Sequence, residues 1–405
     1  MLAVVCLAEF LGMTLWFSAT AVTPLLVRDF GISPGQTPWL TMAVQAGFVA
    51  GTLVSALANL ADLLNPRVLM LLGSIAGAGA NAAVLVAPGP ISVIALRFLT
   101  GASLALVYPP GMKIAAGWFR ERRGFALGLL IGALTLGKAF PHLLTALFGN
   151  EWREPMLVVS ALAVIGGVCV ILFVRDGPHV APTAPFDPHA IRRIVASRGA
   201  RLATFGYLGH MWELYAMWTW IAVFATASLA EAGGGKPPGL PVAEGEIAAF
   251  LAIASGAAGC SMAGYLADRL GKARVAMWSM LASAVCAALT VVTFGASPLW
   301  LFALVMFWGF AVVADSAQFS ALVTEYAPAD HIGTALTLQT CLGFLLTMVT
   351  IEYLPRVAEM TSWRWASLLL VPGPLLGAWA MWKLIPGSRL PVPDSRFPAP
   401  DRVTS

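Results

Sequence analysis

Long apolar blocks with almost no charge make up most of this sequence, and short polar linkers separate them. A helix needs roughly 20 apolar residues to cross a hydrocarbon core about 30 Å thick. Only helices and closed barrels satisfy all backbone polar groups inside lipid, and continuous apolar runs favour helices. Charged residues are 11% of the chain, whereas soluble domains carry about 25%. The blocks therefore predict an all-α integral membrane protein.

Twelve such blocks are present, and we expect each to be one membrane-spanning helix. They cover residues 2–27, 38–58, 67–87, 91–112, 124–148, 155–174, 202–229, 246–266, 273–294, 298–323, 332–354 and 365–385. The first block is too long for a signal peptide and has no basic residue before it, so we interpret it as a spanning helix. The predicted units are a six-helix bundle (1–174), a central loop (175–201), a second six-helix bundle (202–385) and a tail (386–405).

The Lys and Arg residues are distributed unevenly among the linkers. If both termini lie in the cytoplasm, 17 of the 24 basic residues fall in cytoplasmic segments and 5 in outer segments. Cytoplasmic loops carry such an excess of Lys and Arg. We therefore expect a multi-pass protein of a bacterial inner (plasma) membrane, with both termini, the central loop and the tail cytoplasmic.

The two halves of the chain repeat each other. Gly101 corresponds to Gly309, and Trp152-Arg153 corresponds to Trp363-Arg364, with further matches at shifts between 206 and 211 residues. Parallel repeats of this kind are a known plan for transporters, which bind substrate between the halves near the bilayer midplane. The repeat predicts two pseudo-symmetric bundles around such a site.

One loop motif carries a family resemblance. Residues 264–274 read GYLADRLGKAR, which resembles the G-x-L-a-D-R-x-G-R/K signature of the major facilitator superfamily. Residues 58–67 are a degraded copy, and Arg97 to Gly101 is similar to the R-x-x-x-G motif of proton-coupled members. The resemblance implies the twelve-helix fold of that family, alternating access and a monomer. Nitrate-type members use Arg in the second and eighth helices, and this chain has none there.

The loop motif predicts a conformational latch. An Asp at a helix end can accept hydrogen bonds from a neighbouring helix N-terminus and pair with Arg. We expect Asp268 to pair with Arg269 or Arg274, and Asp62 with Arg67 in the second copy. The alternative is that these loops are simply the basic cytoplasmic loops of a membrane protein.

Five ionisable residues lie well inside the predicted helices. They are Glu9, Arg97, Lys138, Glu213 and Asp315. Such residues are costly in a bilayer and usually mark substrate or ion pathways. On the helical faces, other polar and aromatic residues accompany them. We predict a substrate site formed by Lys138, Arg97, His142, Gln45, Trp16, Trp218 and Gln318. We predict proton coupling by Glu213, His210, Asp315 and Glu9. The alternative for the five charged residues is a structural charge pair or polar cap, and for Trp16 and Trp218 it is ordinary packing.

These observations predict a secondary active transporter of a small organic anion, coupled to protons, by alternating access as symporter or antiporter. Three alternatives remain: efflux of hydrophobic or cationic compounds, soft-metal (copper) transport, and a non-transporting sensor or assembly factor. We expect no enzyme activity, catalytic residue, cofactor, resident metal site or nucleic-acid partner. The expected partners are the small-molecule substrate, protons and the lipid bilayer.

Overall fold

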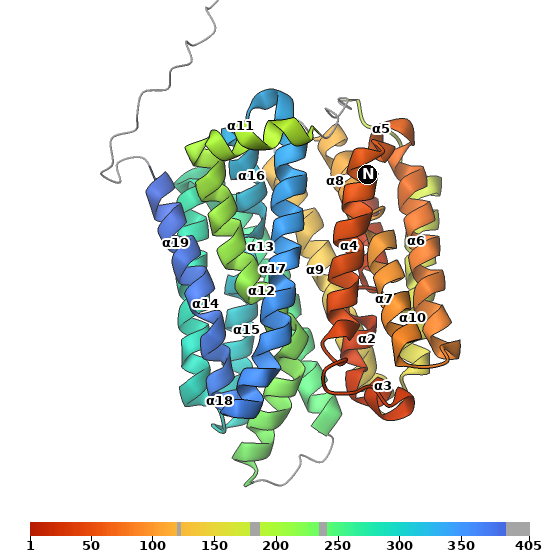
Figure 1. Ribbon diagram of the computed structural model, residues 1–405, viewed down its shortest axis with the longest axis vertical. Helices are drawn as coiled ribbons and strands as arrows, with labels where there is room; N and C mark the ends of the chain where they lie inside the picture. The colour runs from red at the N-terminus through yellow and green to blue at the C-terminus, as the bar shows by residue number, and fades with distance from the viewer. Residues whose placement is uncertain (120–122, 179–186, 235–240, 386–405) are drawn as a thin grey trace, which may run out of the picture.

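A computed structural model describes residues 1–119, 123–178, 187–234 and 241–385, which form helices and connecting turns with no strand in those ranges. Two helical bundles stand side by side (Figure 1). The predicted tail, residues 386–405, lies outside the described residues, as do residues 179–186 of the predicted central loop.

The first bundle, called the N-half, contains the first ten α-helices. They are α1 (Leu2–Met13), α2 (Ser18–Ala21), α3 (Thr23–Phe30), α4 (Trp39–Leu57), α5 (Leu60–Leu63), α6 (Pro66–Ala83), α7 (Pro90–Leu104), α8 (Tyr108–Trp118), α9 (Arg123–Phe148) and α10 (Arg153–Phe173). A short helix, α11 (Ile191–Ala196), leads into the second bundle.

The second bundle, called the C-half, begins with a 35-residue helix that takes in the last residues of the predicted loop. Its helices are α12 (Arg198–Ala232), α13 (Pro241–Leu270), α14 (Lys272–Thr293), α15 (Pro298–Ala314), α16 (Ser316–Tyr326), α17 (Ile332–Met360), α18 (Trp363–Ala366) and α19 (Pro372–Leu384). The N-terminus and the end of α19 lie at the same end of the molecule as α11, called the α11 end (Figure 1). The opposite end is called the α18 end.

Twelve helical segments can be recognised along the described chain. Ten stretches are long and apolar enough to cross a membrane. The other two are α12 and the interrupted segment α1–α3, whose first part is a short apolar helix. The predicted all-α, twelve-helix fold is therefore confirmed.

Three predicted continuous helices are interrupted, and on this point the sequence-based boundaries were wrong. Breaks separate α1 from α2 at residues 14–17, α7 from α8 at residues 105–107, and α15 from α16 at Asp315. Each break leaves backbone groups without helical partners inside the bundle. Hydropathy does not reveal such breaks, because the residues around them remain apolar.

The repeat seen in the sequence is also a repeat of helix contacts. A Cβ on Gly101 would lie 2.1 Å from the Val44 carbonyl oxygen, so α7 crosses α4 in close contact. A Cβ on Gly309 would lie 1.7 Å from the Ala252 carbonyl oxygen, so α15 crosses α13 in the same way. Gly309 follows Gly101 by 208 positions, and Ala252 follows Val44 by the same number. The two halves therefore share one crossing geometry at matched positions.

The two halves meet mainly along two helix pairs. Helix α9 packs along α13, and α4 packs against α17. In the second pair, the Phe48 and Phe344 ring centroids are 4.9 Å apart. These contacts place α9 and α4 of the N-half, and α13 and α17 of the C-half, along the interface between the two halves.

Candidate functional site

Lys138 lies at the centre of the interface between the halves. Helix α9 carries it ten residues from the end at Phe148, or about 15 Å along a helix axis. Its ammonium donates a 2.5 Å hydrogen bond to the Tyr215 hydroxyl of α12. The described residues place no carboxylate oxygen within the 4.0 Å ion-pair distance of this nitrogen. The charge is therefore buried without a salt bridge in this part of the chain.

Three aromatic rings surround this ammonium. Its nitrogen lies 4.2 Å from the Trp16 ring centroid, 4.9 Å from Tyr215 and 5.5 Å from Trp218. A cation over an aromatic face is attracted by the ring quadrupole, and more strongly when desolvated. We call Lys138, Trp16, Tyr215 and Trp218 the lysine cage. The structure thus brings together the predicted substrate residues Lys138, Trp16 and Trp218, and adds Tyr215, which the helical-face analysis missed.

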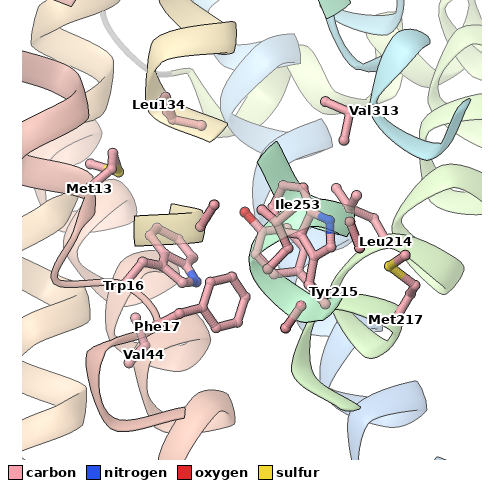
Figure 2. Packing of buried hydrophobic residues seen from close by; sticks show 14 of the residues in the cluster. Met13, Trp16, Phe17, Val44, Leu134, Leu214, Tyr215, Met217, Ile253 and Val313 are labelled. Carbon is pink, nitrogen blue, oxygen red and sulfur yellow. The ribbon is translucent and has the colours of Figure 1, made fainter. Parts of the chain in front are cut away.

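The cage continues into a larger aromatic cluster that joins the halves. Trp16 lies 5.5 Å from Phe344 and Phe17 lies 6.0 Å from Trp218, as centroid distances. Figure 2 shows Trp16 and Phe17 of the N-half pointing towards Tyr215 of the C-half. Any rocking of one half against the other must change these ring contacts.

Several buried polar atoms near the cage have no hydrogen-bond partner among the described residues. They include the indole nitrogens of Trp16 and Trp218 and both amide atoms of Gln45. Gln45 lies one turn from Phe48 on the same face of α4. An unsatisfied buried polar group costs about 1–3 kcal/mol. The cage is therefore bordered by donors that a bound solute could satisfy. Gln318 is buried in α16, and no described contact joins it to the cage.

Arg97 is positioned differently from Lys138. Its guanidinium donates to the carbonyl oxygens of Leu15 at 3.0 Å and Trp16 at 2.7 Å, in the break between α1 and α2. It also donates to Ser18 at 2.9 Å, to Asn81 at 2.8 Å and, at 3.5 Å, to the Leu40 carbonyl. All five donors of an arginine are thus occupied. This geometry favours a structural role, holding the helix break, over the predicted anion-binding role.

Glu9 lies in α1 and is completely buried. Neither of its carboxylate oxygens has a hydrogen-bond partner among the described residues. It packs so closely on Gly111 that a Cβ there would lie 1.8 Å from Glu9 Oε1. Glu9 and Lys138 interact electrostatically across the packed helices α1 and α9. Glu9 therefore provides a buried, ionisable carboxyl group near the lysine cage without forming an ion pair.

The three predicted proton-coupling residues of the C-half form two separate clusters within that half. Glu213 Oε1 accepts hydrogen bonds from Ser283 at 2.8 Å and from the Trp308 indole at 2.6 Å. His210 Nδ1 lies 2.8 Å from Asp315 Oδ1, at the break between α15 and α16. All of these residues are buried. A proton bound here would change contacts inside one half.

His142 makes a contact that the sequence analysis did not predict. Its Nδ1 lies 2.5 Å from Glu246 Oε2, and both side chains are buried. His142 is on α9 and Glu246 on α13, so this pair joins the two halves. Glu246 was overlooked because it is the first residue of its apolar block. Glu246 lies near the start of α13, beside the last turns of α9. That proximity could have been found only from the packing of the two helices.

The predicted latch residues lie at the α11 end. Arg67 contacts Asp176, with Nε 3.2 Å from Oδ1, and donates to the Val174 carbonyl at 2.9 Å. Arg269 lies over the Tyr265 ring at 4.3 Å. Within the described chain, no ion pair involves Asp268 or Arg274. The side chain of Asp62 lies outside the described residues. The latch role stays a prediction.

The ranges that the structure describes contain no group of three or more His, Cys, Asp or Glu side chains placed to hold a metal ion. The arrangement can instead do two things. The lysine cage can bind a negatively charged group against aromatic faces, and the buried acids and histidines can bind protons.

Comparison with known proteins gives consistent matches. The sequence profile of the Major Facilitator Superfamily matches residues 5–351 and, in a second match, 238–403. A probable actinorhodin transporter of Streptomyces coelicolor is 24% identical over 214 residues, 51% of this chain and 36% of that protein. High affinity nitrate transporter 2.7 of Arabidopsis thaliana is 26% identical over 173 residues, 40% of this chain and 35% of that protein. The chain thus aligns with about a third of each relative's length.

A solved structure matches the whole fold. The crystal structure of a mutant of the nucleoside transporter NupG superposes with a TM-score of 0.70 at 17% sequence identity. The superposition covers 95% of this chain and 99% of that one. At this identity the match establishes the common fold.

Proposed function

The chain belongs to the major facilitator superfamily and is a multi-pass membrane transporter of that type, and on this premise we propose that it carries a small organic anion coupled to protons. Transport proceeds by alternating access, with the N-half and C-half rocking around the lysine cage. The names of the relatives include an actinorhodin transporter and a nitrate transporter, so relatedness alone does not select the substrate.

One observation carries the choice of an anion. The Lys138 ammonium is buried at the interface and has aromatic faces and a neutral hydroxyl as its nearest partners. A buried charge without a paired counter-charge is costly. A carboxylate beside Lys138 would relieve this cost with a charge-assisted hydrogen bond. A cationic solute would instead be repelled there, which favours the anion over the efflux of cations.

The surroundings of Lys138 refine the substrate. The indole donors of Trp16 and Trp218 lack partners among the described residues, and both rings belong to the cage. Such donors suit the oxygens of an anion, and the ring faces suit a planar group through offset or edge-to-face contacts. We therefore propose a carboxylate that carries an aromatic ring as the preferred kind of anion.

Proton coupling is proposed for the buried acids. Glu213 and Asp315 each contact a group that can exchange hydrogen bonds when the acid gains or loses a proton. Glu9 lies close enough to Lys138 for its protonation to change the field at the substrate site. We propose that these residues carry the proton in a bacterial inner membrane, with the α11 end in the cytoplasm as the Lys and Arg bias predicts.

Purified protein in proteoliposomes tests this function. An inward proton gradient is imposed and uptake of three matched compounds, benzoate, cyclohexanecarboxylate and benzamide, is followed, with the rate in protein-free liposomes subtracted because the neutral acids cross lipid unaided. Benzoate should accumulate fastest, cyclohexanecarboxylate more slowly, and benzamide, which is nearly the same shape without the charge, should not accumulate. Collapsing the gradient with a protonophore should abolish accumulation. Uptake of benzamide but not of either carboxylate would overturn the anion proposal.

A further inference from the structure

The contact between His142 and Glu246 is a buried, ionisable bridge between the two halves. It lies six residues from the end of α9 and five residues from the start of α13, or roughly 8–9 Å from the α18 end of each helix. Lys138 lies one turn further in on α9. The bridge therefore sits between the lysine cage and the α18 end.

The other buried acids of the molecule do not connect the halves in this way. Glu213 and Asp315 contact partners inside the C-half, and Glu9 packs on Gly111 inside the N-half. A ligand shifts a conformational equilibrium only by its difference in affinity for the two states. A proton on the bridge meets that condition directly, because opening the α18 end must separate His142 from Glu246.

We propose that the His142–Glu246 bridge is a proton-binding site, and that closing the α18 end of the transporter takes up one proton there. This inference rests on the proposed alternating-access cycle. It assigns a role to Glu246 and a role to His142 beyond the predicted contact with substrate.

The argument follows from charge. A neutral histidine beside an ionised glutamate would bury a net negative charge, which is costly. One added proton makes the buried pair neutral overall, and a charge-assisted hydrogen bond then holds it at 2.5 Å. When the halves separate, both side chains become hydrated, and a free histidine keeps its proton only below about pH 6.5. Closure therefore binds a proton at neutral and mildly alkaline pH.

The neighbouring ionisable groups do not replace this proton. Helices α2 and α15 carry no ionisable side chain, and the Phe17 ring lies 6.0 Å from the His142 ring. The ionisable groups nearest the α18 end of the packed helices are engaged with other partners or lie near the surface. They are Lys138 and Tyr215, which bind each other, Glu231, which lies 3.9 Å from Arg364, and Arg153, Glu154 and Glu244 near the surface. Further along these helices, Glu9 packs on Gly111, and Glu213, His210 and Asp315 have partners within the C-half.

A distance measurement tests the proposal without requiring a known substrate. Spin labels are placed on cysteines introduced at Leu147 and Leu299, which are exposed at the α18 end of opposite halves. The five native cysteines are replaced by alanine. Double electron–electron resonance in nanodiscs then gives the ratio of closed to open molecules between pH 8.5 and pH 6.5.

One proton taken up on closure makes this ratio rise about tenfold for each unit that the pH falls. Glu246→Gln and His142→Asn should each reduce the change to less than twofold per unit. Glu244→Gln, two residues away on the same helix, should keep the tenfold slope. A wild-type ratio that does not vary with pH, or a Glu246→Gln protein with the full slope, would overturn the proposal. Uptake assays are independent of this readout, so failure of the proposed substrate would leave the result interpretable.

Discussion

Replacing Arg97 with lysine separates a structural role from an anion-binding role. Lysine keeps the positive charge but offers three donors in place of five. Arg97 now satisfies the Trp16 carbonyl at 2.7 Å, and the helix break at residues 14–17 gives that oxygen no other described partner. The single Ser18 hydroxyl hydrogen can serve either the Leu15 carbonyl, at 2.9 Å, or Asn81 Oδ1, at 2.6 Å.

The cost can be estimated from these contacts. At least two of the five hydrogen bonds from the guanidinium must be lost in Arg97→Lys. Hydrogen bonds to charged groups contribute about 1.5–3 kcal/mol each, so the free energy of unfolding should fall by about 3 kcal/mol or more. If Arg97 held the break, the loss of stability would accompany any loss of transport.

The assay is denaturant unfolding in mild detergent, followed by tryptophan fluorescence, beside uptake in proteoliposomes. Lys138→Met is the matched control, because it removes the other buried basic residue, which has no described ion pair. Its free energy of unfolding should change by less than about 1 kcal/mol, since removing an unpaired buried charge offsets the lost contacts. An Arg97→Lys protein with wild-type stability and impaired anion uptake would refute the structural role.

Two further predictions concern packing and pH. Gly101→Ala should lower the free energy of unfolding by about 1–3 kcal/mol through overpacking, because its Cβ would meet the Val44 carbonyl of α4. Gly79→Ala is the control, since Gly79 has open space around it and its replacement should not lower stability. Thermal unfolding compares the two variants. Hydrogen bonds from Arg28 and Trp152 lower the pKa of Asp29 below its usual value. The stabilisation from Asp29 is therefore full above about pH 4 and is lost as the pH falls through that lowered pKa. In Asp29→Asn this acid-dependent loss should disappear from the thermal midpoint measured between pH 6 and pH 3, and an unchanged acid profile would contradict the assignment.

The fold could be predicted from the sequence because lipid imposes a simple rule on helix length. The apolar blocks and the repeat are global properties, and the match between Gly101 and Gly309 in the sequence corresponds to a repeated helix crossing. The helix breaks were missed because a break depends on which side chains from other helices satisfy its backbone groups. The partners of Arg97, for example, come from the break in the first spanning segment and from α6.

The site was predicted only in part, for a related reason. A helical face indicates which residues point inward, and Lys138 and His142, which share a face of α9, are both buried. It does not indicate which residue of another helix will lie opposite. Tyr215 and Glu246 were therefore missed, although they are the partners of Lys138 and His142. Contacts between distant segments are determined by how the two halves pack together, and the sequence of a single helix does not show that packing.

The most direct test of the anion site is the initial uptake rate of the carboxylate that the wild-type protein carries fastest, measured in wild type and in Lys138→Met. Loss of a charge-assisted hydrogen bond, about 1.5–3 kcal/mol, predicts a fall of at least tenfold in the rate at low substrate concentration. The protein should remain folded, with an unchanged thermal midpoint. A Lys138→Met protein that takes up the carboxylate at the wild-type rate would contradict the account.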